Sequence, residues 1–248
     1  MADIEAIRAY YAKILPCYER EAAARGDLPF WEDLVRRWRP RRILEIGCGN
    51  GRVTRRLART AAAVGVDISF DLLARARRSP RPRRARFVAA DFREAVFDRG
   101  FDLIVAPSDP ISHLTRLPDR RRAIRAAARQ LAPGGRFVLE ALVLPGAKAV
   151  RFERSIRDRQ GELRIREDWT PAGEQGLWLA TFAYRQPRRG GGFETTRASF
   201  LARSWEPARI GRLFSSCGLS VEAAWGGYSR RPWRPDSRRL IVVARRSA

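Results

Sequence analysis

Short apolar runs alternate with amphipathic stretches over much of the chain. Between residues 41 and 143, runs that suit buried strands are separated by segments whose apolar positions recur every three or four residues. This order predicts a doubly wound α/β core with a largely parallel sheet. After residue 150 a period-two pattern with many aromatic residues predicts three antiparallel strands, over ELRIREDW, LWLATFAYR and FETTRASFLARSW.

Four regions follow from these patterns. Residues 1–40 are expected to form an N-terminal helical lid, with one helix over 3–25 and a second that begins after Asp27, which is placed to cap it. Residues 41–149 form a cofactor-binding core. Residues 150–204 form an antiparallel β insertion after the fifth strand, and 205–248 complete the core with a helix and the last two strands. The insertion is expected either to roof an acceptor site or to form a homodimer surface.

A turn with three glycines carries the most specific chemistry. The sequence ILEIGCGNGRVTRRL places Gly47, Gly49 and Gly51 between a buried strand and the start of a helix. Glycine permits φ > 0 and lets a ligand lie against bare backbone. Arg52 stands where a dinucleotide fingerprint needs its third glycine, and the Gly-Lys-Ser/Thr ending of a P-loop is absent. The carboxylate of Glu45 would repel a pyrophosphate but suits a cationic ligand.

Two acidic residues follow at informative distances. Asp67 ends the second strand twenty residues after Gly47 (67 − 47 = 20), which places it to bind the two ribose hydroxyls of an adenosine. The run ARFVAADF is a third strand that ends at Asp91 and Phe92. The alternative is that each acid caps the helix after it, as Asp commonly does at such junctions.

Together these motifs resemble those of class I S-adenosylmethionine-dependent methyltransferases. The segment GDLPFWEDL, the loop ending PISHL and the tail GLSVEAAWGGYSRRPWRPDSRRLIVVARR resemble a small-molecule branch that includes amino-sugar N,N-dimethyltransferases and glycine-type N-methyltransferases. The resemblance implies a Rossmann-like, seven-stranded α/β fold, S-adenosyl-L-methionine as cofactor and a small-molecule acceptor. The cofactor residues expected on this basis are Glu45, Gly47, Cys48, Gly49, Asn50, Gly51, Arg52, Asp67, Ile68, Ala90, Asp91, Phe92, Pro107 and Ser108.

Asp91 would then bind the adenine amino group, and Phe92 would cover the face of the ring. The pair Asp109-Pro110 departs from some relatives, which have a small polar pair there, so the contacts that orient the acceptor stay open.

Three residues are candidates for catalysis. His113, the only histidine, lies in the loop after the fourth strand, at the sheet edge where ligands bind. It is either a general base or a structural residue that packs the loop. Tyr11 and Tyr18 share one helical face if the helix continues through Pro16. They are expected either to contact the sulfonium region and close the pocket or simply to pack on the sheet.

Composition bears on the partners and the cellular compartment of the protein. Only Lys13 and Lys148 among the 50 basic residues are lysines, and the net charge is +23. The arginine runs (Arg36-Arg37, Arg55-Arg56, Arg77-Arg78, Arg83-Arg84 and Arg120 to Arg122) are spread along the chain, which favours a compositional origin over a nucleic-acid surface. Three cysteines without a CxxC pair indicate no metal site and a reducing cytoplasm. No signal peptide or membrane helix is expected.

The sequence therefore favours methylation of a small molecule at an amine nitrogen. O-methylation of a hydroxyl or carboxylate is the alternative within the same chemistry. An RNA or anionic-lipid methyltransferase would instead use the positive charge. A scaffold without turnover is disfavoured by the intact glycine turn and by Asp67 and Asp91.

Overall fold

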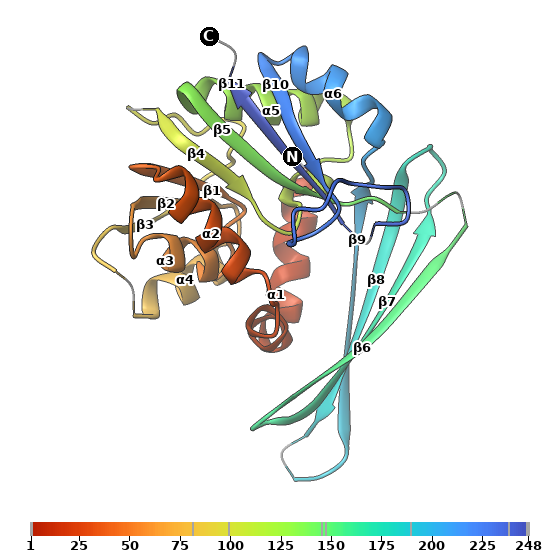
Figure 1. Ribbon diagram of the computed structural model, residues 1–248. Coiled ribbons are helices and arrows are strands. Elements are labelled where there is room, and N and C mark those ends of the chain that lie inside the picture. The colour runs from red at the N-terminus through yellow and green to blue at the C-terminus, as the bar shows by residue number, and fades with distance from the viewer. Residues whose placement is uncertain are drawn as a thin grey trace.

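The computed structural model describes residues 2–80, 82–98, 100–144, 146, 148–188, 190–237 and 239–246. A seven-stranded sheet in the order β10-β11-β5-β4-β1-β2-β3 forms its centre (Figure 1). The strands are β1 (Arg42–Ile46), β2 (Ala62–Asp67), β3 (Ala85–Ala89), β4 (Phe101–Ala106), β5 (Leu131–Ala141), β10 (Leu219–Trp225) and β11 (Leu240–Arg246). The first five strands run parallel, and β11 is antiparallel to both β5 and β10. The predicted α/β fold is confirmed.

Helices cover both faces of this sheet. They are α2 (Leu28–Trp38), α3 (Arg52–Leu57), α4 (Phe70–Arg78), α5 (Leu117–Gln130) and α6 (Pro207–Ser215), with a 3₁₀ turn η1 (Pro110–His113). Trp31 of α2 and Leu57 of α3 belong to one buried apolar cluster, whereas Ile124 of α5 and Phe214 of α6 belong to another. The sheet thus separates two apolar layers, and its carboxyl edge is left for the loops that bear chemistry.

Asp27 occupies the N-cap position of α2, as predicted, but its side chain makes no capping hydrogen bond. Its carboxylate is fully buried and accepts hydrogen bonds from Trp31 Nε1 (3.0 Å) and from both terminal nitrogens of Arg52 (2.7 and 2.9 Å). Burial opposes ionisation, but the bonds from Arg52 outweigh it and lower the pKa of Asp27. The residue therefore ties the start of α2 to the helix that follows the glycine turn.

The insertion contains four strands, where the sequence predicted three. They are β6 (Val150–Asp158), β7 (Gly161–Pro171), β8 (Leu177–Pro187) and β9 (Phe193–Arg203), antiparallel and in sequence order. The missed strand is β6, an edge strand that is mostly exposed. Its register puts Arg154 opposite Ile165, so a charged residue interrupts the apolar alternation that would have revealed the strand.

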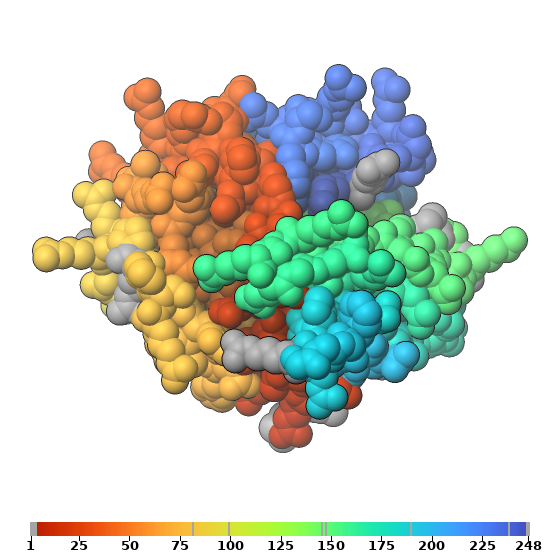
Figure 2. Space-filling view, turned by 90° about the horizontal axis from the view of Figure 1, so that it is seen from below, coloured from red at the N-terminus to blue at the C-terminus, as the bar shows by residue number. Residues whose placement is uncertain are grey.

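Helix α1 (Ala2–Ala23) lies between the core and this second sheet, and it continues through Pro16. Tyr10, Ile14 and Cys17 pack against the inward side chains of the second sheet, among them Ile165 and Trp169. Figure 2 shows the second sheet (green and cyan) lying over α1 (dark red) beside the core (orange and yellow). No helix in the described ranges is long and apolar enough to cross a membrane.

Candidate functional site

Three cavities meet at the carboxyl edge of the core sheet, and Tyr11 and Tyr18 of α1 line all three. The largest encloses about 560 Å³ between α1, the loop after β4 and the second sheet. The other two enclose about 70 Å³ each, and both touch Gly47 and Pro110. The site therefore has one roomy compartment and a narrow groove in two parts.

The glycine turn has the backbone that the sequence predicted. Gly47, Gly49 and Gly51 have φ values of +68°, +53° and +74°. A Cβ atom at Gly47 would overlap Pro110, and one at Gly49 would overlap the Tyr18 hydroxyl. Gly51 lines none of the three cavities; it stands at the start of α3.

Asp67 holds this turn in place. One carboxylate oxygen accepts from the Gly49 N–H (2.7 Å) and the other from the Ser69 N–H (2.8 Å). Helix α4 is capped by Ser69, whose hydroxyl accepts from the Leu72 N–H, so the capping alternative for Asp67 is wrong. Burial raises the pKa of Asp67, although these hydrogen bonds oppose the rise.

One part of the narrow groove is polar. Seven of the expected cofactor residues line it, namely Glu45, Gly47, Cys48, Asn50, Arg52, Pro107 and Ser108. Glu45 is buried and accepts a hydrogen bond from Thr54, and burial raises the pKa of Glu45 to about 8. Arg25, which the sequence analysis missed, also lines this part and donates to the Ser108 hydroxyl (2.5 Å). The Glu45 carboxyl group and the Arg25 guanidinium suit the ammonium and carboxylate ends of an amino acid.

The other part is more apolar. Gly49, Asp67, Ile68, Asp91 and Phe92 line it, together with Ile4, Ile7 and Leu114. The Asp91 carboxylate is bound by Arg93, with the closest contact at 2.6 Å. Ala90, also expected at the cofactor, packs against the core cluster and lines none of the cavities. An apolar slot with a carboxylate at its edge fits an adenosine, so the two parts together fit S-adenosylmethionine.

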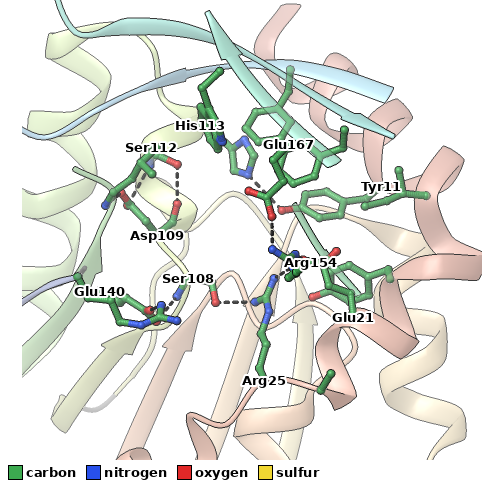
Figure 3. A pocket seen from close by; sticks show the side chains of 18 of the residues that line it. Tyr11, Glu21, Arg25, Ser108, Asp109, Ser112, His113, Glu140, Arg154 and Glu167 are labelled. Atoms are coloured by element: carbon green, nitrogen blue, oxygen red, sulfur yellow. Dashed lines mark hydrogen bonds and ion pairs between the residues drawn. The ribbon is translucent and has the colours of Figure 1, made fainter. Parts of the chain in front are cut away.

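The three predicted catalytic residues lie together, and Figure 3 shows Tyr11 beside His113. The hydroxyl of Tyr11 is 3.1 Å from His113 Nε2, and the Tyr11 and Tyr18 rings meet edge to face at 5.7 Å. His113 is only 9% exposed, and burial lowers its pKa to about 4. Among the described residues its Nδ1 atom has no hydrogen-bond partner, although it is buried. His113 is therefore a neutral imidazole that lines two of the cavities, while its Nδ1 atom is buried away from them.

Asp109 fixes the loop that carries His113. It adopts a left-handed conformation (φ +49°), and its carboxylate accepts from the backbone N–H groups of Ser112 (3.0 Å) and Leu142 (2.7 Å) and from Trp205 Nε1 (2.7 Å). Burial raises the pKa of Asp109 to about 6, against the opposing effect of Arg120. Asp109, part of the pair that departs from some relatives, thus positions the loop that carries His113.

An aromatic wall from the second sheet closes the large cavity. Phe182 and Phe200 stack with ring centroids 5.8 Å apart, and Tyr10 of α1 meets Phe200 at 4.7 Å. Trp169 and Tyr184 line the same cavity. The insertion therefore lines the large cavity beside the narrow groove.

Three carboxylates in this cavity come from distant parts of the chain. Glu21 accepts from Tyr184 (2.9 Å) and Arg154 (2.7 Å), and Arg154 also binds Glu167. Glu140 accepts from the Ser108 N–H at 2.9 Å and pairs with an arginine of the C-terminal segment. The sequence analysis did not identify these acids, because they lie on three elements that only the fold brings together.

Comparison with known proteins agrees with this geometry. A methyltransferase domain model matches residues 43–135. The chain is 27% identical to a cypemycin N-terminal methyltransferase from Streptomyces, over 83% of each protein. It is 31% identical to 27-O-demethylrifamycin SV methyltransferase from Amycolatopsis mediterranei, over 67% of this chain and 73% of that one. The S-adenosylmethionine-bound amino pentose methyltransferase CalS10 from Micromonospora echinaspora superimposes with a TM-score of 0.77 at 20% identity, over 94% of this chain and 95% of that one.

Proposed function

This chain belongs to the class I S-adenosylmethionine-dependent methyltransferases, and we propose that it methylates the nitrogen of a small-molecule amine. S-adenosyl-L-methionine is its cofactor. Glu45, Arg25 and Ser108 would hold the amino-acid end of the cofactor, and Asp67 and Phe92 the adenosine.

The burial of His113 and its contact with Tyr11 favour nitrogen over oxygen as the acceptor atom. A neutral amine attacks with its own lone pair, whereas an alcohol must lose a proton as it attacks and so needs a competent base. An imidazole whose pKa is about 4 is a poor base for that task. We assign His113 Nε2 and the Tyr11 hydroxyl, which lie 3.1 Å apart beside the large cavity, to hold the acceptor amine by a hydrogen bond, which would orient its lone pair toward the methyl group.

The other residues align and enclose the reactants. When bound, the cofactor supplies an electrophilic methyl group on a sulfonium centre. Tyr11 and Tyr18 lie where the narrow groove opens into the large cavity, and their rings suit a cation. The aromatic wall excludes water, and holding the two reactants in line supplies much of the acceleration.

Several further observations support this proposal. Among the relatives, the names of a cypemycin N-terminal methyltransferase and an amino pentose methyltransferase favour an amine acceptor, whereas that of 27-O-demethylrifamycin SV methyltransferase favours the alternative at oxygen. The arginines of the large cavity, Arg25, Arg154 and Arg239, each contact an acid, which does not favour RNA as acceptor. Three free, buried cysteines support a reducing compartment such as the cytoplasm.

Matched acceptor pairs test the proposal. The protein and S-adenosylmethionine are incubated with an amino sugar, a peptide with a free N-terminus, and analogues in which a hydroxyl replaces the amine. Release of S-adenosylhomocysteine and the mass increase of one methyl group are measured. We expect methylation of amines only. Methylation of the hydroxyl analogues at equal rate, or of RNA in their place, would overturn the assignment to nitrogen.

A further inference from the structure

The fold gathers arginine runs that the sequence disperses. Arg36, Arg56 and Arg84 belong to three separate runs, at the ends of α2 and α3 and before β3. All three line one groove of about 930 Å³. Some of the arginine runs, whose spread along the chain favoured a compositional origin, therefore lie close together in the fold.

This groove lies opposite the active site. Its residues precede or begin β1, β2 and β3, so it occupies the amino edge of the sheet, whereas the cofactor groove occupies the carboxyl edge. Strand β1 has five residues, which separates the two edges by about 15 Å. The groove is thus independent of the methyl-transfer site.

The charge of the groove is strongly one-sided. Six of its fourteen lining residues are arginines, and Glu32 is its single acid; arginines supply only 48 of the 248 residues in the whole chain. Arg36 pairs with Asp33, and Arg56 pairs with Glu32. In the described part of the chain, Arg39, Arg59 and Arg84 form no ion pair and are exposed. Several guanidinium groups are therefore free to bind an external anion.

The groove between the arginines has an apolar floor. Pro29 and Ala62 are exposed on it, and the buried side chains of Val35, Leu57 and Ala61 lie beneath them. No aromatic residue is among the lining residues on which a nucleic-acid base could stack. A phosphodiester backbone offers nothing apolar to cover such a surface. An acidic peptide segment with apolar side chains offers both kinds of contact.

We propose that this groove docks an acidic amphipathic segment of a partner protein, with carboxylates on the arginines and apolar side chains between them. The probe is a labelled peptide of about 15 residues, built from Leu, Glu and Ala with Leu at helical spacing, and a scrambled peptide of the same composition is its control. Binding is followed by fluorescence anisotropy at low and physiological salt.

We expect the ordered peptide to bind and its affinity to fall as salt rises. The double variant Arg59→Glu/Arg84→Glu should weaken binding about tenfold or more. The matched control is Arg125→Glu/Arg129→Glu, an equal charge change on the exposed face of α5, which should bind like the wild type. Turnover of a small acceptor should be equal in all variants, because the groove is remote from the site.

Three results would overturn the proposal. One is equal weakening by the groove and α5 variants, which would mean unspecific attraction to net charge. Another is equal binding of the scrambled peptide. The third is a single-stranded oligonucleotide that binds in a groove-dependent way while the ordered peptide does not, which would assign the groove to nucleic acid.

Discussion

Burial of His113 predicts a specific loss of stability in mild acid. The native pKa is about 4, against about 6.5 for an unperturbed histidine. As the pH falls below about 6.5, the unfolded chain binds a proton at this residue that the native protein does not bind. Stability is therefore lost as the pH falls from about 7 to about 4, and below that both states are protonated and the loss stops.

The size of the effect follows from the shift. A pKa unit corresponds to 1.36 kcal/mol, so the full loss is about 3 kcal/mol, of which about 2 kcal/mol is reached at pH 5. Because His113 is the only histidine, no other imidazole contributes to this window. The carboxylates that titrate nearby are common to the wild type and to a His113→Asn variant, so the difference between the two isolates the imidazole.

Urea unfolding at pH 7 and pH 5 measures this loss of unfolding free energy. The wild type should lose about 2 kcal/mol more than His113→Asn between these pH values. Proton NMR of the single histidine ring gives a direct check, since its signal should titrate near pH 4 in the folded protein. Parallel pH dependence of the two proteins, or ring titration near pH 6.5, would refute the claim that the imidazole is held neutral by burial.

Three further predictions concern the site. Asp67→Ala should weaken the binding of S-adenosylmethionine and of S-adenosylhomocysteine by about 1.5–3 kcal/mol, measured by calorimetry, because charge-assisted hydrogen bonds are lost. An unchanged affinity would show that Asp67 does not bind the cofactor. His113→Ala should lower the methylation rate about 10- to 100-fold at equal cofactor affinity, while His113→Asn keeps most of the rate; an equal loss of 10²–10⁴ in both would instead make His113 a proton acceptor. Asp27→Asn should destabilise the protein by about 3–5 kcal/mol in urea unfolding, since it leaves Arg52 without its partner; a loss below about 1 kcal/mol would show that the pair contributes little.

The core could be predicted because local sequence rules determine it. The glycine turn is predictable because Gly47 and Gly49 adopt φ values that other residues rarely adopt. The strand before it is predictable because buried parallel strands are apolar on both faces. The same rules failed for β6, where Arg154 takes an inward position. That arginine is stabilised by Glu21 and Glu167, two residues far from it in the sequence.

Site residues could be predicted where one sequence segment supplies them, but not where the fold brings several distant segments together. Local sequence patterns cannot reveal that Asp27 binds Arg52, because the two residues are 25 positions apart in the chain. Asp27 precedes a helix and matches a cap by local rules. Its carboxylate binds Trp31 and Arg52 in place of the capping hydrogen bond. The acids of the acceptor cavity were missed for the same reason.

Helix α1 contacts both the cofactor groove and the second sheet, and this affects how such a protein can evolve a new acceptor specificity. Tyr11 and Tyr18 of this helix line the cofactor groove, and Ile14 and Cys17 of the same helix belong to the apolar cluster of the second sheet. A substitution on the second sheet can reshape the acceptor cavity while the glycine turn keeps its geometry. A substitution in α1 alters both at once, so its effect depends on compensating changes elsewhere. Selection for a new acceptor should therefore accumulate changes in the insertion quickly and in α1 slowly.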